Sequence, residues 1–335
     1  MRQHNATFAN FICRFGDDKV LLDYAYEIVI PAFTRDTYVR SYGTRTHYHF
    51  YEVEIVTLDH KSNPPTIALA GRFVKDTELT RYQVFDELLG LIQDERKMRS
   101  APSSFFILVL NNHRMIYFPE TPHAPDLKSF EATAAYFLQK RHQEYISELY
   151  DQARRDGQRK ATKKALVQAH PWPTLQVVPL TGADSIEEFV RRYETLKQID
   201  FRLVRPNDDI DAGEIFSQIR DLSQSLNADR TKITTANPDE GLDITAAIET
   251  ITEATAGGNQ EVTLNGVDLE GNNLSGNNES FQINAPIADV PPAKEDLIKT
   301  LYEAFQALIA SETLKVPQQG AEQAARMQSL IDRLD

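Results

Sequence analysis

Residues 105–118 read FFILVLNNHRMIYF, and this stretch decides the fold class more than any other part of the sequence. Two apolar runs rich in aromatic and β-branched residues flank Asn111-Asn112, and asparagine tolerates the positive φ angles of tight turns. The stretch therefore predicts a β-hairpin. Asp126, which follows three prolines, predicts the start of a long helix. Its apolar face consists of Leu127, Phe130, Phe137, Leu138, Ile146 and Leu149.

The chain before this hairpin alternates between apolar and polar residues. Residues 26–30 and 51–56 follow the two-residue period of half-buried strands, so both predict strands of a mostly antiparallel sheet. From Thr80 the spacing of Val84, Leu88 and Leu91 changes to that of a helix face. Residues 1–150 are therefore predicted to form an N-terminal sheet with helices.

Residues 151–171 are poor in apolar side chains and end in Pro171-Trp172-Pro173, which predicts a linker helix between two units. The second unit, residues 172–316, is predicted to be α/β and sandwich-like. Its expected elements are a strand at 175–180, a helix from Ser185 through Leu196, a strand at 201–204, helices at 215–226 and 244–251, a hairpin that begins at 261–264 and closes with 281–283, and a helix at 297–308. Residues 317–335 are expected to be a mobile tail. The chain is thus predicted to be an α+β protein of two packed units.

Leucine recurs every five residues at Leu264, Leu269 and Leu274, and a glycine follows each leucine two places on. This spacing is similar to a pentapeptide repeat. Three units are too few to bury the core of a solenoid, so we favour the hairpin.

Composition places the chain among globular proteins, with 335 residues, 41% hydrophobic and 25% charged. A single cysteine, Cys13, excludes an intramolecular disulfide and any zinc site built of several cysteines, and it fits a reducing compartment. No leader pattern stands at the start and no apolar run has the length of a membrane helix, so we expect a cytoplasmic protein that does not insert into membranes. A net charge of −13 disfavours nucleic-acid binding over the whole surface.

One segment departs from this acidity, with six basic residues and one acid within eleven positions. If the segment is helical, Arg155, Arg159 and Lys163 follow one another at i, i+4 and i+8 and form a stripe. Such a stripe can follow a nucleic-acid backbone, although charge runs are also commonly just solvated. The candidate nucleic-acid-binding residues are Arg154, Arg155, Arg159, Lys160, Lys163 and Lys164.

Two further groups of residues have the chemistry of sites. His47 and His49 share one face of a predicted strand and are the candidate metal ligands, but Glu52 and Glu54 point to the other face, so a polar strand without metal is the preferred interpretation. His113 and Arg114 follow the turn of the hairpin, where donors can meet an anion and where polar residues are also expected simply to be solvated. The acidic run Asp208–Asp211 does not match a calcium loop.

The sequence lacks the phosphate-loop, dinucleotide, nucleophile-elbow and zinc-protease motifs, an absence that does not exclude catalysis. A binding protein without cofactor is the preferred interpretation, and an enzyme stays an alternative. Residues 103–117, with the Asn112-His113-Arg114 turn, resemble uncharacterised bacterial proteins associated with mobile elements and phage defence, as does the Arg205-Pro206-Asn207 turn. The resemblance implies a nucleic-acid-binding or partner-docking subunit of a defence system. The alternatives are a metal-dependent nuclease or toxin-like effector and an oligomeric scaffold, joined through the helix at 297–308 or an exposed sheet edge.

Overall fold

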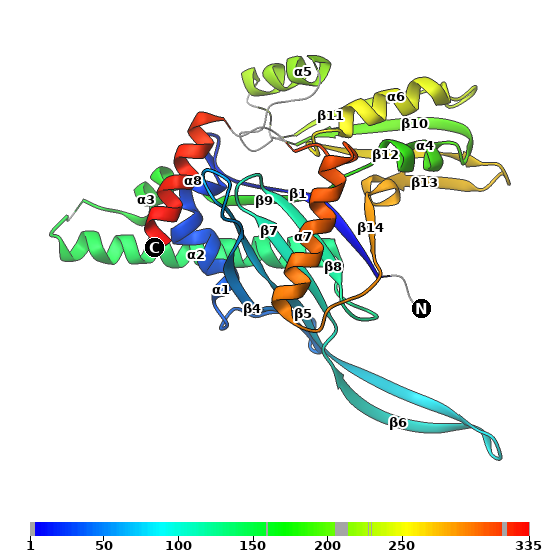
Figure 1. The fold of residues 1–335 in the computed structure, drawn as a ribbon, viewed down its shortest axis with the longest axis horizontal. Helices are drawn as coiled ribbons and strands as arrows, with labels where there is room; N and C mark the ends of the chain where they lie inside the picture. Colours follow the sequence, from blue (N-terminus) through cyan, green and yellow to red (C-terminus); the bar gives the residue numbers. More distant parts are fainter. Residues whose placement is uncertain are drawn as a thin grey trace.

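The computed structural model describes residues 4–158, 160–204, 214–226, 228, 230–316 and 320–334. Over these residues the chain forms two antiparallel sheets with helices packed against them (Figure 1), so the predicted α+β class is confirmed. The Arg205-Pro206-Asn207 turn, the acidic run Asp208–Asp211 and Arg159 lie outside the described residues.

The larger sheet is centred on the predicted hairpin, which is confirmed as β7 and β8 with Leu108 opposite Met115. Its main path runs in the order β14-β1-β8-β7-β5-β4-β3, and β2, β6 and β9 pair beside it. Its strands are β1 (His4–Phe15), β2 (Lys19–Val20), β3 (Arg40–Tyr42), β4 (Thr46–Asp59), β5 (Thr66–Asp86), β6 (Gly90–Ser100), β7 (Ser103–Val109), β8 (Arg114–Pro119), β9 (Pro173–Pro179) and β14 (Asn284–Ile287).

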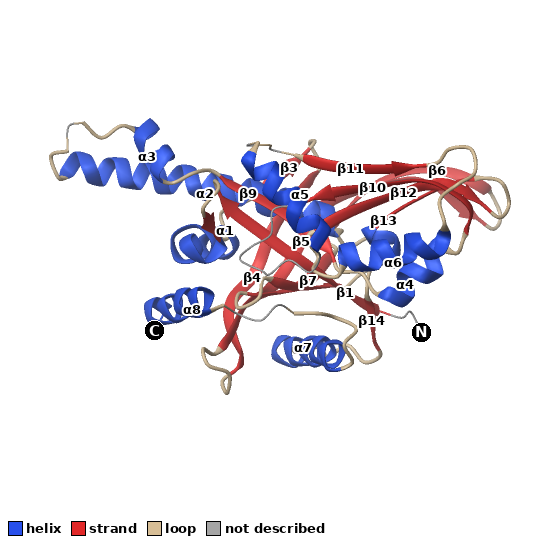
Figure 2. Ribbon diagram, turned by 90° about the horizontal axis from the view of Figure 1, so that it is seen from above, coloured by secondary structure: helices blue, strands red, loops and turns tan. Residues whose placement is uncertain are grey.

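Both faces of this sheet are covered, because successive side chains of a strand point to opposite sides (Figure 2). On β7, Phe105 and Ile107 pack with helix α7 (Lys294–Ala310), whereas Phe106 and Leu108 pack on the other side. That side is covered by α1 (Ile30–Thr34), α2 (Leu127–Arg155) and α8 (Ala321–Leu334). Asp126 caps α2 as predicted, since its carboxylate accepts a hydrogen bond from the Ser129 amide.

Three predictions are wrong: the strand at 26–30, the helix from Thr80 and the mobile tail. Residues 25–29 form a π-helical turn that leads into α1, and this turn buries Ala25, Ile28 and Val29 where it contacts α2 and α8. The predicted helix from Thr80 is instead part of the ribbon of β5 and β6, with Val84 opposite Ile92. The tail forms α8, and its Met327 and Leu330 are buried in the core.

The smaller sheet has the order β11-β10-β12-β13. Its strands are β10 (Tyr193–Leu203), β11 (Thr231–Ala236), β12 (Gln260–Asp268) and β13 (Asn273–Asn277), and helices α4 (Ala183–Val190), α5 (Glu214–Ser225) and α6 (Ile244–Thr255) accompany it. The N-cap of helix α4 is Gly182 rather than Ser185, and the helix stops before Leu196, which is a strand residue. The predicted hairpin exists, but its second strand is β13, and Phe281 instead ends a short 3₁₀ turn at 278–281.

The chain after residue 172 contributes to both sheets. The strand predicted to open the second unit is β9, and it pairs with β1 of the large sheet over seven positions from Ala9↔Pro179 to Phe15↔Pro173. β14 pairs with the start of the same strand. Between these two strands the chain leaves to build the smaller sheet, so the two sheets meet along β1 and β9.

Candidate anion-binding site

A buried polar network holds the two sheets together where they meet. Asn10 of β1 is fully buried, and its Nδ2 donates to the Gly258 carbonyl at 3.2 Å and to Asn259 Oδ1 at 3.0 Å. Arg114 of β8 donates from Nη2 to the Gly257 carbonyl at 3.2 Å. These three hydrogen bonds attach the loop after α6 to the large sheet.

Beside this network lies a cavity of about 390 Å³ that both sheets line. Four arginines from separate parts of the fold reach it: Arg14 of β1, Arg202 of β10, Arg220 of α5 and Arg230 directly before β11. Among the described residues of its lining, Asp17 is the single acid. In a chain with a net charge of −13, this cavity is a local concentration of positive charge.

Two of these arginines form the floor of the cavity. Arg14 is half-buried between β2 and β9, and its guanidinium donates to the backbone carbonyl of Asp17. Arg220 is 8% exposed, and Gln260, with its amide oriented to satisfy both neighbours, accepts from Arg220 Nη2 at 2.6 Å. Burial lowers the pKa of Arg220 to about 10, so the guanidinium stays charged at neutral pH.

The other two arginines stand at the rim. Arg202 is nearly half exposed and donates to Glu261 Oε2 at 2.8 Å, and Arg230 is exposed. A guanidinium presents a planar fork of donors that matches carboxylate and phosphate oxygens. Chemically, the cavity is therefore suited to an anion that enters past the rim and meets the two deeper guanidinium groups.

The predicted basic segment lies elsewhere and does not form one helical stripe. Helix α2 ends at Arg155, and Lys163 begins a separate helix, α3 (Lys163–Ala169). The described members of the segment are exposed at the end of the α2 and α3 pair (Figure 1). Two of them contact the Tyr150 side chain, since Arg154 donates to its hydroxyl at 2.9 Å and Lys163 lies over its ring.

The histidines singled out by sequence lie in two different environments. His47 and His49 are half-buried on β4, opposite Asp76 and Val74 of β5, and burial lowers the pKa of His49. In the described part of the chain no group of three or more His, Cys, Asp or Glu side chains lies close enough together to hold a metal ion. His113 and Arg114 are fully buried, so the solvated turn expected from the sequence is wrong for both.

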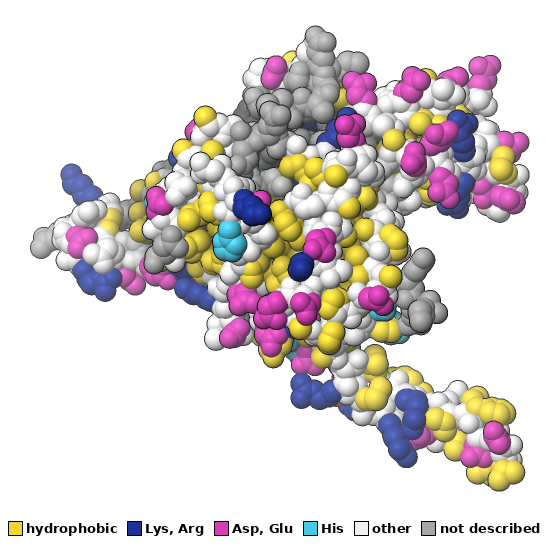
Figure 3. Space-filling view, in the orientation of Figure 1, with side chains coloured by type: hydrophobic (Ala, Val, Ile, Leu, Met, Phe, Trp, Pro, Cys, Tyr) yellow, Lys and Arg dark blue, Asp and Glu magenta, His cyan; other side chains and the backbone are white. Residues whose placement is uncertain are grey.

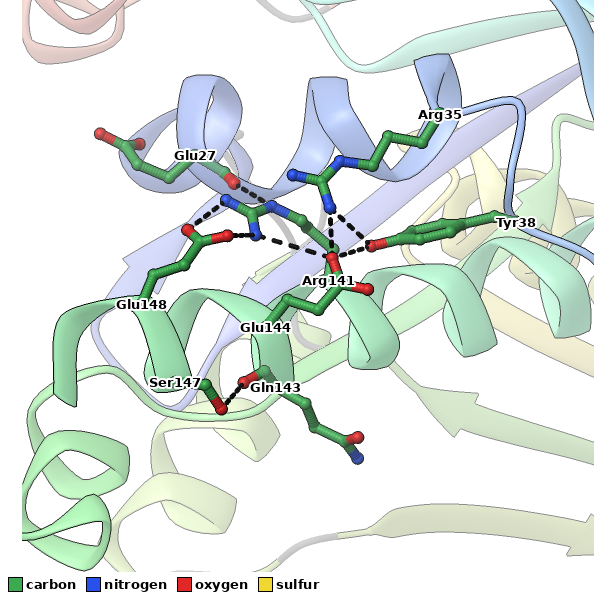
Figure 4. Close-up of polar contacts among 8 residues, drawn as sticks. All are labelled: Glu27, Arg35, Tyr38, Arg141, Gln143, Glu144, Ser147 and Glu148. Carbon is green, nitrogen blue, oxygen red and sulfur yellow. Dashed lines mark hydrogen bonds and ion pairs between the residues drawn. The ribbon is translucent and has the colours of Figure 1, made fainter. Parts of the chain in front are cut away.

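A third charged group, on α2, is internally neutralised (Figure 4). Arg141 is 6% exposed and holds Glu148 with two hydrogen bonds of 2.6 and 2.9 Å, while its Nε donates to the Glu27 carbonyl at 2.8 Å. Arg35 and Tyr38 both donate to Glu144. Two arginines thus match two carboxylates, and the network joins the segment around α1 to α2.

A second cavity, of about 530 Å³, lies between α4, α6 and the loop after α7. Its apolar lining consists mainly of Leu180, Ile186, Ile248, Ile283 and Leu314, whereas Glu249, Glu253 and Glu312 are exposed at its rim. We call it the acid-rimmed cavity. Its charge is opposite to that of the arginine cavity, so the two do not suit the same ligand.

Sequence reasoning missed the arginine cavity, because its four arginines are spread from position 14 to position 230 and no local spacing connects them. The only signal in the sequence was the basic residue at the end of a strand, as in Arg202.

The chain matches no protein-family model, and no curated protein matches it in sequence. None of the described helices combines the length and the apolar character needed to cross a membrane.

Proposed function

We propose that this chain is a nucleic-acid-binding protein and that the arginine cavity holds the phosphate groups of the bound strand. The observation that carries the proposal is the convergence of Arg14, Arg202, Arg220 and Arg230 on one cavity of an otherwise acidic chain. Phosphate contacts supply most of the affinity of proteins for nucleic acids in general. The acidic character of the chain as a whole disfavours contact of the strand with most of the remaining surface.

The size of the cavity indicates how much of the strand it takes. About 390 Å³ is near the small end of the roughly 300 to 1,000 Å³ that is usual for ligand pockets. We therefore expect contact with one phosphate and sugar unit or with a strand end, and not with a long stretch of backbone. A role as a subunit of a bacterial defence system is the biological setting that we propose with it.

The test compares the rim of the cavity with the basic segment. Binding of fluorescently labelled 20-nucleotide single-stranded DNA and RNA is measured by anisotropy between 50 and 200 mM salt. The rim variant combines Arg202→Gln with Arg230→Gln, two exposed positions whose change leaves the core intact. We expect at least tenfold weaker binding and a salt slope reduced by about 0.7, since the loss of one phosphate contact removes about 0.7 from the slope for a single strand.

The matched controls are Arg154→Gln with Arg155→Gln in the basic segment, and Arg191→Gln on α4's exposed end. Both should bind as the wild type does. If the basic-segment variant loses binding while the rim variant keeps it, the site is at Arg154–Lys164 and the cavity is excluded. Binding of a free nucleotide but of no strand would overturn the proposal in favour of a small-molecule ligand.

A further inference from the structure

The β5 and β6 ribbon extends away from the body of the protein as an arm (Figure 1). β5 is paired with β4 as far as Thr77 and with β7 as far as Val74, and from Glu78 on it pairs with β6 alone. We call residues 78–99 the arm. An isolated two-stranded ribbon is only marginally stable in water, so a ribbon of this length gains from a surface to pack on.

The end of the arm is apolar and exposed. Figure 3 shows hydrophobic side chains at its far end and lysine and arginine side chains along its length. Phe85, Leu88, Leu89 and Leu91 are between 65% and 94% exposed, whereas large apolar side chains are normally buried. A contiguous group of this kind marks an interaction surface.

One face of the arm also carries a pair of like charges. The register places Arg81 directly opposite Arg96, on the same face as the Phe85–Leu91 pair, and both arginines share the single carboxylate of Asp94. Like charges directly opposite each other are destabilising in a sheet. Asp94 offsets one of the two charges, so this face keeps a net positive charge (2 − 1 = +1) that favours contact with carboxylates on a partner.

The acid-rimmed cavity has the complementary features. Glu249 and Glu253 are exposed on α6 at positions i and i+4, about 5 to 6 Å apart at Cβ, which matches the roughly 5 Å between the Cβ atoms of a cross-strand pair. Arg81 lies four residues before Phe85 on β5, which is about 13 Å farther from the tip of the arm. When the tip enters the acid-rimmed cavity, Arg81 and Arg96 therefore stand at the rim of that cavity. Lys315, also in the lining, offers a cation to Glu87 at the tip.

We propose that the tip of the arm from one copy of this chain occupies the acid-rimmed cavity of a second copy, with Arg81 and Arg96 opposite Glu249 and Glu253. An anionic lipid surface fits the arm less well, because Asp86 and Glu87 stand at the tip and a carboxylate is costly to bury without a partner. The inference is independent of the arginine cavity, which lies on other elements.

The test is a charge exchange read by light scattering and sedimentation between 1 and 100 µM. The wild type should have at least twice the 38.0 kDa of one chain. Arg81→Glu with Arg96→Glu should reduce it to a single chain, and so should Glu249→Arg with Glu253→Arg. All four changes in one chain should restore the assembly, which a loss of folding cannot do.

Arg99→Glu is the matched control, because Arg99 is 83% exposed on the opposite face of the same arm. It should leave the mass unchanged. The inference is overturned if the wild type is a single chain at 100 µM, if the assembly survives both charge reversals, or if the fourfold exchange fails to restore it. Transfer of a monomeric wild type to vesicles with 30% anionic lipid would overturn it in favour of a membrane contact.

Discussion

The pH dependence of stability should report directly on the buried ring of His113. Both ring nitrogens lack a hydrogen-bond partner among the described residues, and the side chain is fully buried. Burial, with Arg114 beside it, lowers the pKa of His113 to about 3 from an ordinary value of 6.5. The unfolded chain therefore binds a proton below pH 6.5 that the folded chain does not bind until about pH 3, and stability falls as the pH falls through this range.

The magnitude follows from the two pKa values. One pH unit between them corresponds to about 1.4 kcal/mol, so His113 alone should lower the free energy of unfolding by about 2 kcal/mol between pH 7 and pH 5. The variant His113→Asn removes the titration and keeps a residue that tolerates the φ of 58° found here. Urea denaturation of both proteins at pH 7, 6 and 5 measures the difference.

The two proteins are compared by how much the free energy of unfolding changes with pH. A loss of stability that the substitution causes equally at every pH therefore cancels. His142 and His170, whose pKa values burial also lowers, titrate in both proteins and cancel as well. The wild type should lose about 2 kcal/mol more than His113→Asn over these two pH units. Parallel curves for the two proteins would show that the ring is protonated or solvated in the folded state and would refute the reasoning.

Three further predictions concern how the elements are held together. Gly258→Ala should cost about 2 to 4 kcal/mol in chemical denaturation, because the new Cβ meets Leu180 Cδ2 at 2.5 Å at a φ of +68°, whereas Gly271→Ala, at φ +82° in open space, should show only the backbone part of about 1 to 2 kcal/mol; equal costs would mean that the loop is not packed on the sheet. Arg141→Ala should cost about 1 to 3 kcal/mol, because it removes a buried side chain together with its hydrogen bonds to the Glu27 carbonyl and to the half-exposed Glu148, and Arg155→Ala on the same helix should stay within about 0.5 kcal/mol. Leu330→Ala should cost about 2 to 5 kcal/mol if α8 is part of the core, and a loss near zero contradicts its docking.

Sequence patterns predicted an element correctly where its apolar residues are buried within the chain and its signals come from neighbouring residues. The run Phe105–Leu110 is a central strand with both faces covered, so an unbroken apolar run is what its position requires. Asp126 begins a helix because its carboxylate accepts from an amide three residues on. Both signals depend on neighbours in the chain and on nothing distant.

Sequence patterns failed where apolar residues are exposed and where contacts between distant segments decide which residues are buried. Val84, Leu88 and Leu91 have helical spacing, but they lie at the end of an arm where burial within the chain does not set the period. His113 was expected at a solvated turn, and the loop after α6, nearly 150 residues later, covers that turn instead. The arginine cavity is likewise a product of tertiary contacts, so no reading of one segment could find it.

The pairing of β1 sets the order in which this protein can fold on the ribosome. His4 lies opposite Ile287, which is synthesised 283 residues later, about 14 to 57 seconds at 5 to 20 residues per second. During that time the first strand has edges without their final neighbours, and unpaired edges are where chains aggregate. The large sheet is therefore completed only after β14 has been synthesised, and we expect the nascent chain to depend on chaperones until then.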